Sequence, residues 1–212
     1  MRWCVVSGQA YMSAAARVLF ALALFGLPQA AVAHPVFGGV GGFTGGLLHP
    51  WFVPAHLITL IAMAALIAQQ QPEWHWRSHW RAPLLFVAGL TAGSVAIARG
   101  YAPIYSGEAV LTCAAMAGFL VAFGMPLLTR TTAILAAASG VAIAIDSPPD
   151  AIKIGEAILS QLGTFCGACI LLVAVIEIVA RRRHHWQRIG VRLIGSWIAA
   201  SATMVLVLQF AR

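Results

Sequence analysis

Six long apolar segments follow residue 48, and they constrain the fold more than any other feature of the chain. They lie at about residues 50–69, 83–99, 107–127, 131–146, 154–180 and 190–210. An α-helix needs about 20 mostly apolar residues to cross the hydrocarbon core of a bilayer. Only 9% of the residues are charged, against about 25% in soluble domains, so water could not solvate the surface of such a fold. The sequence predicts an all-α polytopic transmembrane helical bundle of about six membrane helices, surrounded by lipid.

The first 33 residues have the composition of a secretory signal peptide. Arg2 and Arg17 supply positive charge, residues 18–27 form an apolar core, and Ala31 and Ala33 fit the small-residue cleavage rule. The apolar core has about ten residues, which is too short to span a bilayer. We therefore expect a signal peptide over residues 1–33 and a single six-helix transmembrane domain over residues 34–212. If the signal were not cleaved, it would form a seventh helix.

The basic residues alternate between the two sides of the predicted membrane. The net charge of +7 does not indicate nucleic-acid binding, because the basic residues lie in short connections rather than on one face. Cytoplasmic loops carry an excess of Lys and Arg. With the signal entering from the cytoplasm, only three of the 13 basic residues fall outside: Arg99, Lys153 and Arg212. Both ends of the mature chain should then lie on the outer side.

The segment after the predicted cleavage site contains six glycines between residues 34 and 48. We expect it to be a flexible outer segment. Cleavage after Ala33 would make His34 the mature N-terminus, where its amine and imidazole form a two-nitrogen chelate. The amine has an ordinary pKa of about 8, so a metal ion could displace its proton.

His49 and His56 are the most informative polar residues. Seven residues are about two turns, or about 10 Å along a straight helix, which is too far for both rings to bind one ion at about 2 Å. Pro50 suits a first helical turn, with His49 at or before the helix start, and Pro54 could bend the segment further. The bend would allow a shared metal site. The alternative is a pair of interfacial histidines, one of them bonded to backbone at a helix start.

Carboxylates also fall toward the predicted outer side. Imidazole and carboxylate ligands suit nickel, cobalt, zinc and copper(II), so Glu108 joins His34, His49 and His56 as a candidate ligand. Asp146, by contrast, is assigned with Asp150 and Glu156 to an exposed connection, where solvation explains the charge.

Sulfur ligands are a second type of candidate. Cys166 and Cys169 share one face of a helix and, with Cys113 and Met116 from another span, could offer soft ligands. Because Gly163 and Gly167 form a pair of small residues four apart, we interpret the two cysteines as packing residues at a helix–helix contact.

A short motif resembles a known family. Gly42, Phe43, Gly46, Leu47, His49, Pro50 and His56 match in register the pattern G-F-x-x-G-L-x-H-P-x-x-G-x-D-H of the HupE/UreJ family. The resemblance implies a protein of the bacterial inner membrane that acts as a nickel or cobalt permease. The outer side predicted from the basic residues is then the periplasm, and both mature termini should lie there. The chain departs from the pattern at Val53, which replaces a glycine, and at Ala55, which replaces an acidic residue. Residues 139–149 also lack the expected histidines, as does the helix around Cys169, and these losses should weaken metal binding or change the preferred metal.

Together these features predict a membrane permease or metal-binding accessory protein for a divalent transition metal: nickel, cobalt or copper. We expect no tightly bound cofactor beyond that ion. The alternative is a non-transporting structural or assembly subunit, bound to a membrane-protein partner or to copies of itself. No nucleophile–base pair or cofactor motif is visible, so we do not expect an enzyme.

Overall fold

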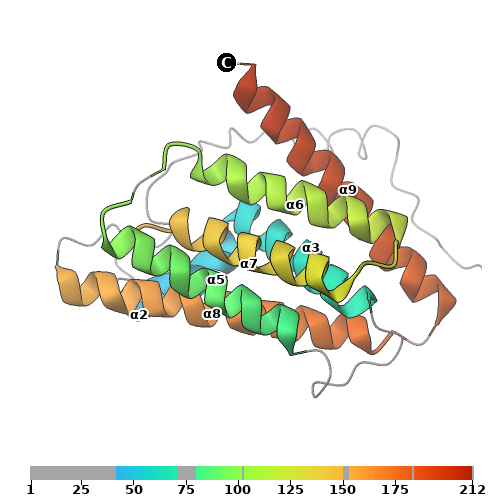
Figure 1. Ribbon diagram of the computed structural model, residues 1–212, viewed down its shortest axis with the longest axis horizontal. Helices are drawn as coiled ribbons and strands as arrows, with labels where there is room; N and C mark the ends of the chain where they lie inside the picture. Colours follow the sequence, from blue (N-terminus) through green and yellow to red (C-terminus); the bar gives the residue numbers. More distant parts are fainter. Residues whose placement is uncertain (1–41, 71–79, 102, 150–152, 183, 212) are drawn as a thin grey trace, which may run out of the picture. The chain divides into compact units, whose positions relative to one another are not determined.

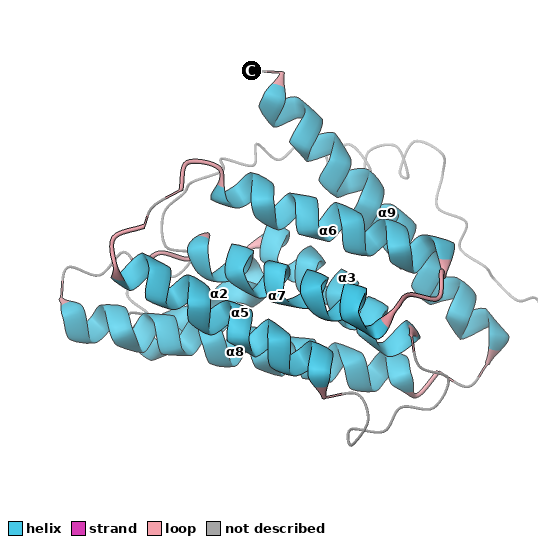
Figure 2. Ribbon diagram, in the orientation of Figure 1, coloured by secondary structure: helices cyan, strands magenta, loops and turns pink. Residues whose placement is uncertain are grey.

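The described part of the protein is entirely helical. The computed structural model describes residues 42–70, 80–101, 103–149, 153–182 and 184–211, and all of them belong to one compact unit, residues 35–212. These residues form helices and short connections without a strand (Figure 2). The expected signal peptide and His34 lie outside the described residues, so the domain boundary at residue 33 stays a prediction.

The described residues of this unit form seven helices, whose arrangement Figure 1 shows. Four of them, α5, α6, α8 and α9, are each long and apolar enough to cross a bilayer. Helices α2 and α3 pass the same test only as a pair, bent by 69° at their junction, and α7 is a shorter apolar helix. The predicted all-helical membrane architecture is confirmed. The helices are α2 (Gly42–Phe52), α3 (Pro54–Gln69), α5 (Arg81–Ala98), α6 (Ser106–Phe123), α7 (Thr129–Ile145), α8 (Ile154–Ala180) and α9 (His185–Phe210).

The start of the first described helix differs from the expectation. Residues 42–48 were expected in a flexible segment, but they form most of α2, and Pro50 lies inside this helix rather than in its first turn. Glycine disfavours a helix by about 1 kcal/mol relative to alanine. Here packing outweighs that preference: a methyl group on Gly46 would overlap the backbone of Ser160, so only glycine allows α2 to lie this close to α8.

Glycines on both partners also explain the other close helix contacts. Helix α5 packs on α7, where a methyl group on Gly89 would overlap the backbone of Ala137, and one on Gly140 that of Phe86. Helix α6 packs on α9 through Gly118 and Gly195. In lipid, where burial of apolar surface no longer drives association, such close backbone approach favours helix pairing.

The α2–α8 contact confirms the predicted role of the small residues in α8. A methyl group on Gly163 would overlap the backbone of Phe43, and one on Gly167 would overlap that of Leu47. Cys166 and Cys169 are free thiols at intermediate burial on the same helix.

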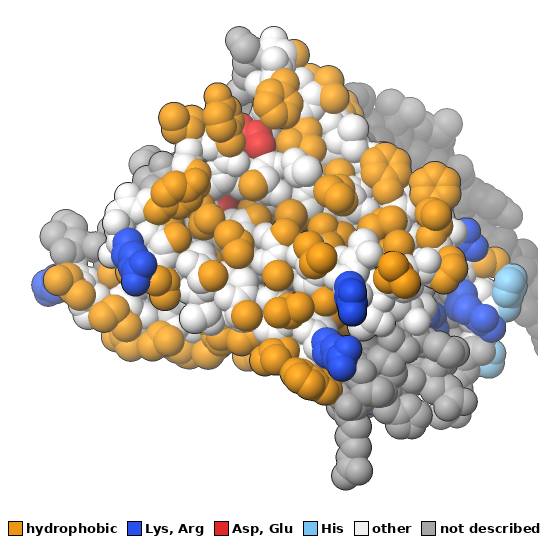
Figure 3. All heavy atoms as spheres, viewed as in Figure 1, with side chains coloured by type: hydrophobic (Ala, Val, Ile, Leu, Met, Phe, Trp, Pro, Cys, Tyr) orange, Lys and Arg blue, Asp and Glu red, His pale blue; other side chains and the backbone are white. Residues whose placement is uncertain are grey.

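Helix α3 lies among these three pairs and contacts α2, α6, α7, α8 and α9. Ten of its residues are buried, including His56 and Thr59. The outer helices expose large apolar side chains such as Trp197, which is 73% exposed. On the face drawn in Figure 3, hydrophobic side chains are spread across the described surface, with few Lys and Arg among them. Such a surface is solvated by lipid rather than water, and the buried polar side chains of His56 and Thr59 on α3 are shielded from both.

Candidate metal site

The break between α2 and α3 follows from its prolines. Pro54 is the first residue of α3, after Val53 in an extended conformation. A proline has no amide hydrogen to donate, and its ring clashes with the carbonyl four residues earlier, here that of Pro50. Helix α2 therefore ends at Phe52, and α3 leaves at an angle of 69°.

This bend brings the two histidines together. The ring centroids of His49 and His56 lie 5.1 Å apart, with the ring planes tilted by 60°. With metal–nitrogen bonds of about 2.0–2.1 Å and an angle of about 90–110° at the ion, two imidazoles on one ion have centroids roughly 4.5–5.2 Å apart. The bend therefore brings the two rings close together, with Pro54 rather than Pro50 marking the break; that they share one ion stays a prediction.

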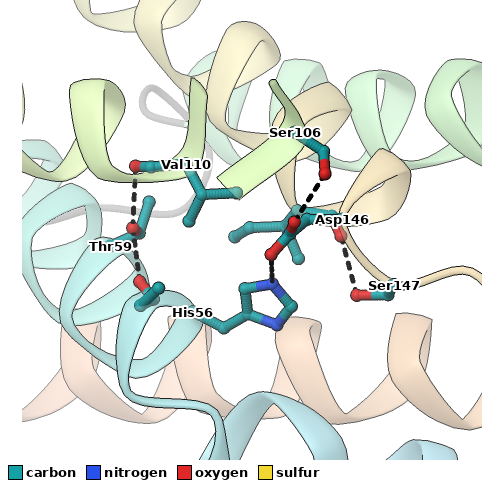
Figure 4. Close-up of polar contacts among 8 residues, drawn as sticks. His56, Thr59, Ser106, Val110, Asp146 and Ser147 are labelled. Atoms are coloured by element: carbon teal, nitrogen blue, oxygen red, sulfur yellow. Dashed lines mark hydrogen bonds and ion pairs between the residues drawn. The ribbon is translucent and has the colours of Figure 1, made fainter. Parts of the chain in front are cut away.

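The His56 ring is oriented by a carboxylate from a distant helix. His56 is completely buried, and its Nε2 atom lies 2.9 Å from Oδ2 of Asp146 (Figure 4). An ionised carboxylate only accepts hydrogen bonds, so Nε2 carries the hydrogen and a neutral ring keeps its lone pair on Nδ1. That Nδ1 atom is buried and has no hydrogen-bond partner among the described residues.

Asp146 is itself held in place by α6. Its Oδ1 accepts a hydrogen bond from Oγ of Ser106, at the first residue of α6, over 2.8 Å (Figure 4). Asp146 directly follows Ile145, the last residue of α7. Its two oxygens lie within hydrogen-bond distance of His56 and Ser106, and such hydrogen bonds favour the carboxylate form.

Sequence reasoning missed this role, because Asp146 was interpreted as a solvated residue of an exposed connection. Its side chain is only 20% exposed. The available signal was that Asp146 ends a span on the same predicted side as His56. The structure also shows that the absence of an acidic residue at position 55 does not leave His56 without a carboxylate.

Thr59 fixes the first turns of α3 against α6. Its Oγ1 atom lies 2.6 Å from the carbonyl oxygen of Ala55 and 3.1 Å from that of Val110 (Figure 4). Val110 lies on α6, so the Thr59–Val110 contact joins α3 to α6. Together with the Ser106–Asp146 bond, it fixes α3, α6 and the end of α7 relative to one another around His56.

The other proposed ligands are not joined to this pair. Glu108 lies in the first turn of α6, but its side chain makes no hydrogen bond or ion pair with another described residue. His34 lies outside the described residues. Among those residues, no group of three or more His, Cys, Asp and Glu side chains is arranged to hold a metal ion. The described site thus consists of two imidazoles and a carboxylate that supports one of them.

Many metal sites contain a carboxylate that does not bind the ion but accepts a hydrogen bond from a histidine that does. A ligating histidine usually donates its second ring N–H to a carboxylate, which fixes the tautomer and makes the ligating nitrogen more basic. His56 has this arrangement, with Nδ1 as the nitrogen available to an ion.

Comparison with known proteins assigns the chain to a family. A family model described as "HupE / UreJ protein" matches residues 22–205. No curated protein and no solved structure matches the chain.

Proposed function

Because this chain belongs to the HupE/UreJ family, a family associated with nickel and cobalt transport or accessory functions, we propose that it is a permease for a divalent transition metal. In this proposal His49 and His56 capture nickel or cobalt at the periplasmic end of the bundle, and copper is the next candidate. The ion is the transported substrate rather than a resident cofactor.

The observation that carries the proposal is the pair of imidazole rings 5.1 Å apart at a broken helix. Membrane transporters commonly bind their substrates where a helix is interrupted, because the break frees polar groups inside the bilayer. A polar or ionisable group buried in a membrane protein is costly and is retained mainly for function. His56 lies just after the helix break, is completely buried and contacts a carboxylate, so it has both features.

Two imidazoles leave coordination positions open for further ligands. We propose the imidazole and terminal amine of His34 as the first of these, if the chain is cleaved after Ala33. Glu108, in the first turn of α6, is the second. Water or a chelating small molecule would complete the coordination of an ion that must also be released.

The direct test is metal uptake by the purified protein in liposomes that contain a metal-sensitive dye. Wild-type protein should accumulate Ni²⁺ or Co²⁺, while His49→Ala and His56→Ala should each reduce the initial rate at least tenfold. His185→Ala is the matched control, because it removes an exposed imidazole from the first residue of α9. This control should transport at the wild-type rate.

Each result separates the candidate functions. Metal binding that requires His56, without uptake by the wild-type protein, would favour an accessory role. Neither binding nor uptake of any divalent metal, together with copurification of a stoichiometric membrane partner, would favour the structural or assembly subunit instead.

A further inference from the structure

Helices α3 and α7 meet through polar and sulfur-containing side chains at matched intervals. His56 of α3 contacts Asp146 at the end of α7, and seven residues further into the bundle Met63 of α3 contacts Ser139 of α7. The helices are antiparallel, so a step of seven residues forward along α3 corresponds to a step of seven residues back along α7. Seven residues are about two turns, or about 10 Å along the axis. A second polar contact therefore lies about 10 Å inward from the histidine site.

This second contact combines side chains from three helices. Oγ of Ser139 lies 3.7 Å from Sδ of Met63 and donates a hydrogen bond to the carbonyl oxygen of Leu135 over 2.8 Å. The side chain of Cys113, on α6, lies beside Ser139. Met63 and Ser139 are completely buried, and Cys113 is 9% exposed. Two sulfur atoms and a hydroxyl group thus meet near the middle of α3, enclosed by α6 and α7.

The same register continues toward the opposite end of the helix pair. Thr132 precedes Ser139 by seven residues on α7, and Gln69 is the last residue of α3. Oγ1 of Thr132 and Oε1 of Gln69 are both buried and have no hydrogen-bond partner among the described residues. Unpartnered buried oxygens are costly in a bundle core. Both residues lie toward the ends of α3 and α7 that are further from His56.

We propose that the thioether of Met63, flanked by the protonated thiol of Cys113 and the hydroxyl of Ser139, is a second, transient binding point for the metal ion, inward from the histidine pair. This inference rests on the proposed transport function. It adds a point on the path of the ion through the bundle that membership of the family does not imply. The ligand class is a borderline or soft divalent ion such as Ni²⁺, Co²⁺ or Cu²⁺. Hard ions such as Mg²⁺ and Ca²⁺ prefer oxygen ligands and should not be accepted.

The chemistry of the contact suits an ion that must move on. A divalent ion pays a large desolvation cost in a bundle core, so an unbroken apolar path inward from His56 would present a high barrier. A binding point about 10 Å further on divides that barrier into shorter steps. The Met63 thioether binds without losing a proton, so no proton acceptor is needed there. Its weak ligation also allows release.

Uptake by the full-length protein in liposomes is the first test. Met63→Leu conserves volume but removes the sulfur, and should lower the initial rate of Ni²⁺ or Co²⁺ uptake at least tenfold. The affinity of the outer site, measured by equilibrium binding, should stay within twofold of wild type. Met116→Leu is the matched control: Met116 is 51% exposed on the same helix as Cys113, so this variant should transport normally. If Met63→Leu does not fold, Ser139→Ala is the second variant, with the same expectation.

Thiol protection is the second test, and it does not depend on transport. Wild-type protein would be treated with a small membrane-permeant maleimide with and without Ni²⁺ or Co²⁺, and modification of each cysteine measured by mass spectrometry. The ion should slow modification of Cys113 at least threefold, while Cys169 on α8 serves as the internal control and should react at an unchanged rate. Mg²⁺ should protect neither.

The two tests together distinguish failure of this inference from failure of the proposed function. Normal uptake by Met63→Leu, with Cys113 unprotected, would overturn the second binding point and leave the permease intact. Protection of Cys113 without uptake by the wild-type protein would retain the binding point and reject transport. Neither uptake nor protection in the wild-type protein would reject both.

Discussion

Nε2 of His56 lies 2.9 Å from Oδ2 of Asp146, although 90 residues separate them in the chain. Asp146 also accepts a hydrogen bond from Ser106, so one carboxylate links α3, α6 and the end of α7. This contact determines which nitrogen of His56 keeps its lone pair. In the proposed metal site, the affinity of the buried ring should therefore depend on a residue that need not touch the ion.

Replacing Asp146 should weaken metal binding without removing a ligand. Loss of a carboxylate that orients a ligating histidine typically costs 10–100-fold in metal affinity, and we expect Asp146→Ala to fall in this range for Ni²⁺ or Co²⁺. Equilibrium binding to the purified protein measures the effect. Glu156→Ala is the control, since it removes an exposed carboxylate that pairs with Lys153, and the metal affinity of this variant should stay within twofold of wild type. Equal affinities for Asp146→Ala and wild type would contradict the positioning role.

Features that depend on local sequence could be predicted. The membrane class follows from the length and apolarity of the segments, and the break at Pro54 follows from the missing amide hydrogen of proline. The close contact at Gly163 and Gly167 follows from their spacing. The Arg181–Glu177 ion pair, 3.2 Å long, likewise matches a spacing of four residues on one helix.

Features that depend on a residue far away in the sequence could not be predicted. The glycines of residues 42–48 indicate flexibility by their own preference, and only the backbone of α8 makes a helix favourable there. Asp146 looks like any residue of a connection until α7 is placed against α3. His34 and Glu108 stay proposals as ligands, because their role depends on where an arm and a helix end meet the histidine pair.

The orientation of the bundle leads to a labelling prediction. Arginines cluster after α8 and at the start of α9, while Lys153 precedes α8. By the positive-inside rule, the start of α8 should face the periplasm. In a chain without its native cysteines, Lys153→Cys should react with a membrane-impermeant maleimide in intact cells, and Arg188→Cys should react only after permeabilisation. The reverse pattern would invert the proposed direction of metal entry.

The packing of α2 on α8 leads to a stability prediction. A methyl group on Gly163 would overlap the backbone of Phe43, so Gly163→Ala should lower the free energy of unfolding by about 1–3 kcal/mol, the usual cost of overpacking. Gly155→Ala, on the same helix, meets nothing within 4 Å and should be neutral or slightly stabilising. Reversible denaturation in detergent measures both variants. Similar stabilities for the two would mean that α2 does not depend on this contact.

The bend at Pro54 leads to a prediction about the histidine pair itself. Pro54→Ala restores an amide hydrogen and removes the clash with the carbonyl of Pro50, so α2 and α3 can straighten into one helix. The ring centroids of His49 and His56 now lie 5.1 Å apart. On a straight helix the two residues would be separated by about 10 Å along the helix axis. One ion could no longer bridge them.

We expect Pro54→Ala to bind Ni²⁺ or Co²⁺ at least tenfold more weakly than wild type, although every proposed ligand is still present. Pro83→Ala is the matched control, because Pro83 lies in the first turn of α5, at a helix start that carries no proposed ligand. Its metal affinity, measured in the same equilibrium assay, should stay within twofold of wild type. Wild-type affinity in Pro54→Ala would show that the rings are held together by contacts other than the proline bend, or that a single histidine accounts for the binding.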